Sequence, residues 1–311
     1  MRDAFAAEIT QLASEDARLV LLSGDIGNRL FDRYKQRHPE RFLNCGVAEA
    51  NMISMAAGMA LSGLRPVAYT ITPFVTTRCL EQIRVDVCYH NTSVVIVGVG
   101  AGLSYASLGG THHACEDIAF LRVLPNMTIV CPGDAMEVRL AIRAALRQGG
   151  PVYIRLGKKG EPAVHERAPE FAIGKGIVLR AGEDVCLLST GTVLPLAVEA
   201  AARLSKDGVS AQIVSLHTVK PLDEDLLADV AARFPLLVTL EEHSVLGGLG
   251  GSVAEWLAGR SAPGARLLRI GTADEFLHGG GGQDHAREHF GLTAERIAAR
   301  ACAMLKTIGA R

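Results

Sequence analysis

The sequence predicts an α/β fold built as two domains, and three features support this. Short apolar runs alternate with longer amphipathic stretches, which is the pattern of buried strands joined by helices. Apolar residues make up 49% of the chain and 33 glycines offer tight turns, so buried sheets can form. The 311 residues also exceed the roughly 100–200 that one domain usually contains. We therefore expect two α/β units in series.

The first unit is expected to cover residues 1–165. Charged and apolar residues alternate at Met1–Phe5 as in an amphipathic helix. The predicted strands are Arg18–Ser23, Leu64–Ile71, Ser93–Val97, Met127–Cys131 and Val152–Leu156. The predicted helices are Ala50–Leu61, Thr77–Tyr89 and a segment that includes Ile118–Val123. Asp134 follows Pro132-Gly133 and is placed to cap the next helix.

The second unit is expected to cover residues 185–311. Before it, residues 166–184 combine glycine, proline and charge with little periodicity, so we expect a linker there. The predicted strands are Val185–Ser189, Ala211–Val214 and Leu236–Leu240. The predicted helices are Leu194–Ser205, Gln283–Phe290 and Ala294–Lys306. The sequence contains no internal repeat and no low-complexity tract.

Charge and cysteine content narrow the class of protein. The formal net charge is −1 and the basic residues are scattered, so we expect neither a nucleic-acid partner nor a membrane surface. The seven cysteines form no C-x-x-C pair, which favours reduced thiols in a cytoplasmic protein. No signal peptide is recognisable, and no apolar run reaches the about 20 residues that span a bilayer.

Two glycine-rich stretches invite a nucleotide-binding interpretation, which the sequence does not favour. Gly98–Gly102 lacks the third glycine of a dinucleotide fingerprint, so a tight turn beside another ligand is preferred. Gly247–Gly251 lacks the lysine of a P-loop, and we expect close backbone packing at a subunit contact rather than an anion site. His112 and His113 are adjacent, so their side chains diverge and no metal site is predicted.

Three segments in order carry a family resemblance. Asn44–Met52, which reads N-C-G-V-A-E-A-N-M, resembles the G-[IV]-x-E segment of transketolases and deoxyxylulose-phosphate synthases. Gly109–Asn126 resembles their G-x-T-H-x…L-R-x-[IL]-P-[NE] segment. Leu240–Ser244, followed by glycines, resembles the C-terminal domain that transketolases share with the beta subunits of 2-oxo-acid dehydrogenases. The resemblance implies a pyrimidine-binding parallel-sheet domain followed by a transketolase C-terminal-type α/β domain.

The resemblance also implies a cofactor and a partner. Enzymes of this family use thiamine diphosphate, and they hold its diphosphate and a divalent metal with a G-D-G…N segment in another domain. This sequence contains no such segment; Ser23–Asn28 looks close but fits neither in sequence nor in position. We therefore expect a separate N-terminal transketolase-type subunit that holds the diphosphate and Mg²⁺ (or Ca²⁺). Self-association of the present chain would then give a heterotetramer.

The resemblance assigns roles to three residues in particular. Glu49 matches the glutamate that shares a proton with N1′ of the aminopyrimidine, and burial at an interface suits a proton-sharing carboxyl group. Phe74 resembles the aromatic residue that stacks on that ring. His112 matches the histidine that contacts the substrate and moves protons. Without the resemblance, each could be a helix-start acid, a core aromatic residue or a loop histidine.

Three charged residues, and one departure from the pattern of the resembled family, bear on the small-molecule substrate. The resemblance places Asp25 near a position that lines the cofactor, and Arg2 and Lys158 near positions that line the substrate channel. Lys158 could meet an anionic tail of the substrate there. The loop Gly98–Leu108 lacks the second histidine and the aspartate of sugar-phosphate transketolases, and Leu80 replaces a frequent aromatic residue. Small residues in the loop are expected to leave more room, so ordinary pentose phosphates are expected to be poor substrates.

The predicted function is transfer of a two-carbon ketol unit by a subunit that needs its partner. A beta subunit of a 2-oxo-acid dehydrogenase or a related acyl-transferring assembly is the first alternative. The segment Gly109–His113 favours ketol transfer, whereas Glu241-Glu242-His243 fits either reading. A catalytically silent regulatory subunit is the second alternative, and the presence of both Glu49 and His112 argues against it.

Overall fold

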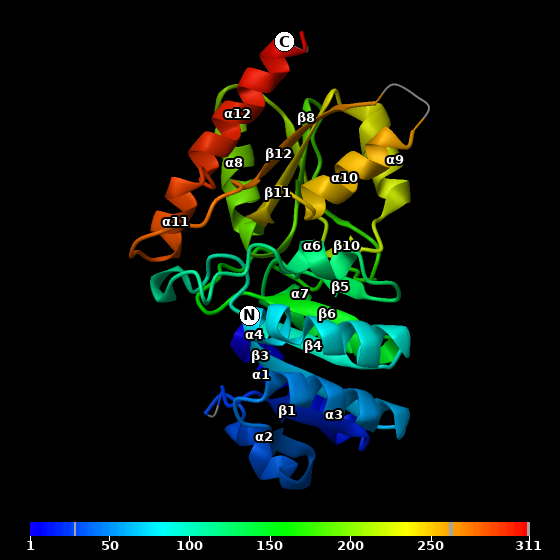
Figure 1. The fold of residues 1–311 in the computed structure, drawn as a ribbon. Helices are drawn as coiled ribbons and strands as arrows, with labels where there is room; N and C mark the ends of the chain where they lie inside the picture. The colour runs from blue at the N-terminus through cyan, green and yellow to red at the C-terminus, as the bar shows by residue number, and fades with distance from the viewer. Residues whose placement is uncertain (28, 261–263, 310–311) are drawn as a thin grey trace.

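The computed structural model describes residues 1–27, 29–260 and 264–309, and its strands form two sheets (Figure 1). The larger sheet has the order β10-β5-β6-β4-β3-β1-β2 and is parallel except for the β10–β5 pair. Its strands are β1 (Leu19–Ser23), β2 (Phe42–Asn44), β3 (Arg65–Ile71), β4 (Val95–Val99), β5 (Thr128–Val130), β6 (Val152–Leu156) and β10 (Thr218–Lys220).

Alternating strand residues give the larger sheet two apolar faces. Leu19 and Leu21 of β1 face one core, and Val20 and Leu22 face the other, because successive side chains of a strand point to opposite sides. Helices α1 (Arg2–Glu15) and α7 (Ala135–Arg147) cover the first face. The other face is covered by α3 (Glu49–Leu61), the π-helical segment η3 (Ile83–Tyr89) and α6 (Asp117–Arg122).

The smaller sheet has the order β12-β11-β8-β9-β7. Its strands are β7 (Ile177–Arg180), β8 (Val185–Ser189), β9 (Ala211–Ser215), β11 (Leu236–Ser244) and β12 (Arg266–Thr272). On one face pack α8 (Leu194–Lys206), α11 (Gln283–His289) and α12 (Ala294–Thr307), and on the other α9 (Glu224–Arg233) and α10 (Leu249–Ala258). The two-domain α/β fold predicted from the sequence is confirmed.

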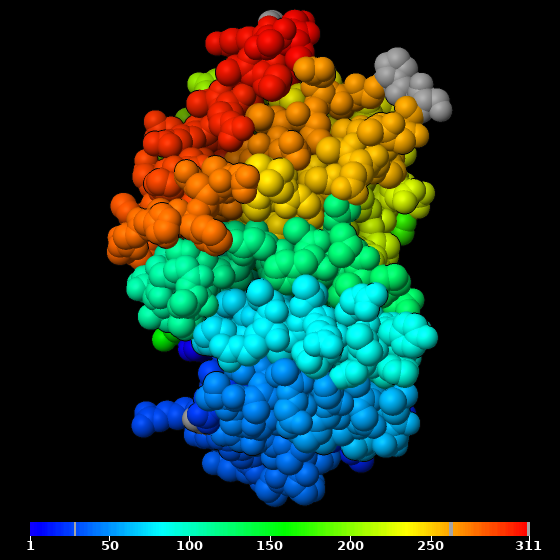
Figure 2. All heavy atoms as spheres, in the orientation of Figure 1, coloured from blue at the N-terminus to red at the C-terminus, as the bar shows by residue number. Residues whose placement is uncertain are grey.

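Two strands do not follow the domain boundaries that were expected from the sequence. The segment expected to be a linker contains β7, which pairs antiparallel with β9 at the edge of the smaller sheet. Strand β10 lies in the second half of the chain but pairs with β5 of the first sheet. Figure 2 shows the two halves in contact, with the green chain around residues 100–130 between them. Three- and four-residue strands carry too little periodicity to be found by pattern.

Other differences are local. The predicted helix Thr77–Tyr89 is helical but divided into a 3₁₀ turn (Thr77–Cys79), one α-turn α5 (Leu80–Gln82) and η3. The pattern missed β2, β12, α9 and the short helix α2 (Asp32–Arg37). All seven cysteines are free thiols. None of the described helices is long and apolar enough to cross a membrane.

Candidate functional site

The residues predicted for the site gather at the carboxyl edge of the larger sheet. Strands β1, β3, β4 and β6 are parallel neighbours, so the loops that follow them leave from one edge. These loops carry Asp25, Phe74, His112 and Lys158, and Glu49 opens α3 after β2. Chemistry at the carboxyl ends of parallel strands is common in open α/β sheets. The topology therefore brings together residues that lie more than 100 positions apart.

Glu49 is a buried carboxylate at the first position of α3. Its side chain is 2% exposed, and its Oε2 atom accepts a hydrogen bond from Arg78 Nη1 at 2.7 Å. Gly24 lies so close that a Cβ atom there would be 3.2 Å from Glu49 Cγ and 2.9 Å from Thr70 Oγ1. The buried Thr70 hydroxyl lacks a hydrogen-bond partner among the described residues. This corner thus combines a buried carboxylate with an unused hydroxyl.

Phe74 presents an aromatic ring beside this carboxylate. It lies in the single-turn helix α4 (Thr72–Val75), directly after β3, where Pro73 starts the turn. The Arg78 guanidinium lies over the Phe74 ring, 4.4 Å from the ring centre, while it also pairs with Glu49. One exposed arginine therefore bridges the two residues that were predicted to bind the pyrimidine.

His112 completes the cluster from the loop between β4 and α6. Its ring meets the Phe74 ring edge to face, with 5.2 Å between centroids. Desolvation by burial, with a smaller contribution from His113, lowers the His112 pKa below its usual value. His113 turns the other way and its Nε2 atom lies 3.3 Å from the Ala106 carbonyl oxygen. The two adjacent histidines therefore diverge, with one facing the cluster and one facing the protein.

Tyr105 is a site residue that the sequence reasoning missed. Its ring lies 4.8 Å from Lys158 Nζ and 6.2 Å, between centroids, from the His112 ring. Burial raises the Tyr105 pKa, while the neighbouring Arg2 guanidinium opposes the shift. The buried Arg2 Nε atom has no partner among the described residues. Tyr105 thus touches all three residues predicted to bind substrate, a relation that no local motif signals.

The room expected in the loop Gly98–Leu108 is taken up by this ring. Gly100 has a φ of 87°, and a Cβ atom there would overlap the Tyr105 ring. The absence of a side chain at position 100 therefore does not open the channel, because an aromatic side chain five residues later fills the space. That part of the expectation is wrong, although the loop still lacks the polar pair of sugar-phosphate transketolases.

Asp25 lies at the margin of the cluster. It is exposed, has a φ of 56°, and its Oδ1 atom accepts a hydrogen bond from Asn44 Nδ2 at 2.9 Å. Asn44 Oδ1 in turn accepts from the Gly46 amide at 3.0 Å. These bonds tie the end of β1 to the loop that leads into Glu49. Asp25 therefore supports the shape of the site, and its contacts lie within this loop pair.

The glycines before α10 pack against the protein's own carboxylate. Glu241 Oε2 accepts from the Leu249 amide at 2.7 Å, and Oε1 accepts from the Gly250 amide at 2.8 Å. A Cβ atom on Gly248 would overlap Glu241 and His243. Burial raises the Glu241 pKa to about 7, while the two amides oppose the shift. The Glu241 carboxyl group therefore occupies this helix N-terminus, and close intrachain packing accounts for the glycines.

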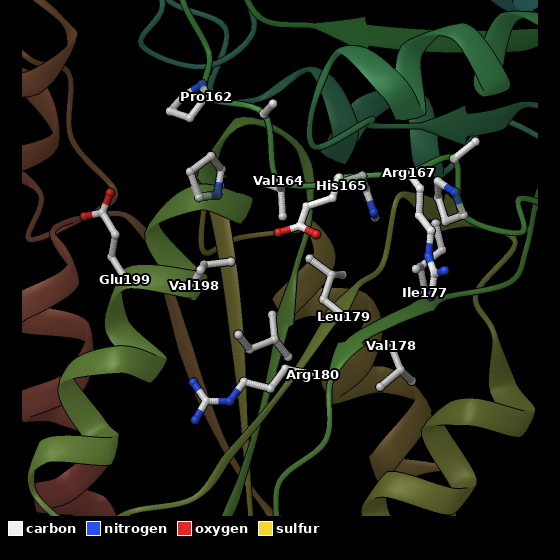
Figure 3. A pocket seen from close by; sticks show the side chains of 16 residues that line it. Pro162, Val164, His165, Arg167, Ile177, Val178, Leu179, Arg180, Val198 and Glu199 are labelled. Atoms are coloured by element: carbon white, nitrogen blue, oxygen red, sulfur yellow. The ribbon is translucent and has the colours of Figure 1, made fainter.

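A separate hollow lies away from the cluster (Figure 3). It measures about 1020 Å³ and lies between residues 162–169, strand β7 and the start of α8. None of the predicted site residues is among those that line it. His165 at its rim bonds to Glu137, with 2.8 Å between Nε2 and Oε1. Within the described residues, no group of three or more His, Cys, Asp or Glu side chains could hold a metal ion.

Comparison with known proteins identifies the family of each domain. Residues 1–161 match the model of the transketolase pyrimidine-binding domain, and residues 174–297 match that of the transketolase C-terminal domain. A putative transketolase C-terminal section of Methanocaldococcus jannaschii is 38% identical over 96% of this chain and 94% of its own length. A 6-deoxy-6-sulfo-D-fructose transketolase subunit of Clostridium sp. is also 38% identical, over 96% and 92%.

A solved structure extends the similarity to three dimensions. The structure described as a split gene transketolase, inactive beta4 tetramer, superposes with a TM-score of 0.87 at 36% identity, and covers 96% of this chain and 95% of that chain. Full-length transketolase structures from Pichia stipitis share the fold at 21% identity, with a TM-score of 0.81. Since both domain models match in order and relatives align along nearly the whole chain, this protein belongs to the transketolase family, as a chain similar to its separate C-terminal subunits.

Proposed function

We propose that this chain is the pyrimidine-binding subunit of a thiamine-diphosphate enzyme that transfers a two-carbon ketol unit. The observation that carries the proposal is the meeting of a buried carboxylate, an aromatic ring and a half-buried imidazole at one sheet edge, in Glu49, Phe74 and His112. A silent regulatory subunit would not need these three groups together. The family membership supports dependence on thiamine diphosphate.

The residues present fit the pyrimidine end of the cofactor. Gly24 leaves the space beside Glu49 free of a side chain, and the Thr70 hydroxyl there is buried without a partner among the described residues. Glu49 would hold a proton at the pyrimidine N1′ atom, and Phe74 would stack on the ring. When bound, the cofactor supplies the nucleophilic carbon that attacks a ketone. His112, whose pKa is lowered by burial, would accept a proton from a substrate hydroxyl near neutral pH.

The diphosphate and the metal ion are assigned to a second chain. The sequence has no G-D-G…N segment that could hold them. Relatives carry names of the form transketolase subunit, which supports a divided enzyme. We propose an N-terminal transketolase-type partner that binds the diphosphate with Mg²⁺ or Ca²⁺, and a heterotetramer of two chains of each kind.

The substrate proposed is a ketose or related donor with an anionic end. Arg2 and Lys158 flank Tyr105 at the far side of His112 and are the cations that could meet that end. Relatives named for 6-deoxy-6-sulfo-D-fructose and for apulose 4-phosphate are consistent with anionic donors that differ from ordinary pentose phosphates. Xylulose 5-phosphate is expected to be a poor donor, because the loop Gly98–Leu108 lacks the polar pair of sugar-phosphate transketolases.

The test is reconstitution with the chain encoded beside this one, followed by calorimetry and a ketol-transfer assay. The isolated chain should not bind thiamine diphosphate at submicromolar concentration with Mg²⁺, whereas the complex should. Glu49→Gln should lower turnover by roughly two orders of magnitude or more, the scale of a lost acid–base group. C2 proton exchange of the bound cofactor, followed by NMR, should slow accordingly.

The exposed Glu81 offers a matched control, since Glu81→Gln makes the same swap near the site but outside it. Tight cofactor binding by the chain alone would contradict the divided enzyme. Exchange at the wild-type rate in Glu49→Gln would remove Glu49 from its role.

A further inference from the structure

The loop of residues 100–115 carries both His112 and Tyr105, and its two ends meet. Gly102 and Ala114 form an antiparallel bridge with N···O distances of 3.1 and 2.9 Å. The side chains of Leu103, Ala106 and Cys115 pack into the core of the second domain. This loop of the first domain therefore packs on the second domain, whereas Glu49 and Phe74, the residues proposed to bind the pyrimidine, lie on α3 and α4.

The end of β11 holds both ends of this loop. Glu242 Oε1 accepts a hydrogen bond from the Leu103 amide at 2.7 Å. Two residues along, the Ser244 amide donates to the Cys115 carbonyl at 2.7 Å. Arg155 Nη2 donates to the Ala114 carbonyl at 2.6 Å and to the Glu242 carbonyl at 3.0 Å. A single strand end thus fixes the two points where the loop enters and leaves.

Among the described residues, the hydrogen bonds to the Glu242 carboxylate come from this loop and from α11 of the second domain. Its side chain is fully buried, and it accepts from Arg287 Nε and, at 2.9 Å, from Gln283 Nε2, both on α11. A buried carboxylate is tolerated only when its acceptor positions are filled, and losing one partner is expensive. A Cβ atom on Gly102 would overlap Glu242, so the glycine lets the loop close directly onto the carboxylate.

We propose that Glu242 is a positioning residue: it clamps the loop 100–115 and thereby sets the place of His112 and Tyr105 against Phe74. The expected effect on kcat rests on the proposed function, whereas the ordering of the loop by Glu242 does not depend on it. It assigns to the second domain a direct part in shaping the site. Glu49 and Phe74 lie on α3 and α4, outside the loop, so the clamp acts on the substrate side of the site.

The test compares Glu242→Gln with Glu241→Gln. Both carboxylates lie on β11 and are 1% exposed, but Glu241 caps α10, and among the described residues it forms no hydrogen bond to the loop. Glutamine at 242 keeps an acceptor for Leu103 but turns an amide N–H group toward the donors of α11. In the double variant Glu242→Gln, Arg287→Met, the amide N–H group no longer faces the Arg287 donor, so part of the loop's order should return.

Hydrogen exchange of the full-length chain is the first readout. Amides of residues 100–115 should exchange at least tenfold faster in Glu242→Gln than in wild type. In Glu241→Gln, the amides of Leu249 and Gly250 should exchange faster instead. In the reconstituted complex, Glu242→Gln should lower kcat by roughly 10- to 100-fold, as misplacement of a reacting group does, while cofactor affinity stays within about twofold of wild type.

Each result bears on a separate idea. Unchanged loop exchange in Glu242→Gln, or equal loop exchange in both variants, would overturn the clamp. A wild-type complex that transfers no ketol unit would overturn the proposed function and leave the exchange result standing. A drop in kcat with unchanged loop exchange would also count against the clamp, because the effect would then not pass through the loop.

Discussion

Arg78 occupies the place where the pyrimidine is proposed to bind, and replacing it should strengthen cofactor binding. Its guanidinium lies 4.4 Å from the centre of the Phe74 ring and 2.7 Å from Glu49 Oε2. Arg78 must break both contacts before a ligand can stack on Phe74 and bond to Glu49. Arg78→Met removes the competing group and keeps a side chain of similar reach.

The size of the effect follows from the two contacts. An exposed cation–π contact contributes about 0.5–1 kcal/mol. An ion pair with both partners exposed contributes about 0.2–1 kcal/mol. The Arg78 side chain is 44% exposed but the Glu49 side chain only 2%, so this range is a lower bound for the pair. Together the two contacts amount to at least about 0.7 kcal/mol, which corresponds to a Kd for thiamine diphosphate that is lower by roughly threefold or more.

Calorimetric titration of thiamine diphosphate into the reconstituted complex at saturating Mg²⁺ measures this Kd. Arg84→Met is the matched control, because Arg84 lies on η3 of the same helical segment but borders a hollow with Tyr89 and Pro125 rather than the site. Its Kd should equal that of wild type. A Kd that rises or stays unchanged in Arg78→Met would refute the reasoning and would make Arg78 a binding residue instead of a competitor.

Two further predictions concern stability. Asp117→Asn should lower the free energy of unfolding by about 3–5 kcal/mol, because it leaves the buried Arg155 without its charged partner. Arg155 Nε lies 2.7 Å from Asp117 Oδ2, and the Asp117 side chain is 1% exposed. Urea denaturation followed by circular dichroism measures this loss, and a loss below about 1 kcal/mol would contradict the prediction. His217→Phe should gain stability relative to wild type as the pH falls. Burial lowers the His217 pKa from 6.5 to about 4, so between these values the unfolded chain binds a proton that the folded chain does not, and the wild type loses stability on acidification. The free energy of unfolding of His217→Phe minus that of wild type should be about 2 kcal/mol larger at pH 5 than at pH 7.5. A difference that stays the same at both pH values would show that His217 titrates normally.

Much of the local structure was predictable because it rests on local pattern. The apolar runs at Arg18–Ser23 and Val152–Leu156 became β1 and β6, and the amphipathic run at Leu194–Ser205 became α8. Asp134 caps α7 as expected, accepting from the Met136 and Glu137 amides. The three segments Asn44–Met52, Gly109–Asn126 and Leu240–Ser244, taken in order, predicted the family, which the comparisons confirm. The roles of Glu49, Phe74 and His112 remain predictions, although the structure brings the three side chains to one place.

What the sequence could not reveal depends on pairs of residues far apart in the chain. Strand β10 has three residues, and only its pairing with β5 makes it a strand. Tyr105 fills the space over Gly100 only because the loop folds back on itself. Glu242 and Leu103 are 139 positions apart, yet their hydrogen bond ties the substrate side of the site to the second domain. Periodicity and motifs predicted the longer buried strands and amphipathic helices, the family and most of the candidate residues. The tertiary structure alone decided which buried charges and rings meet, because those contacts form only when both sheets are packed together.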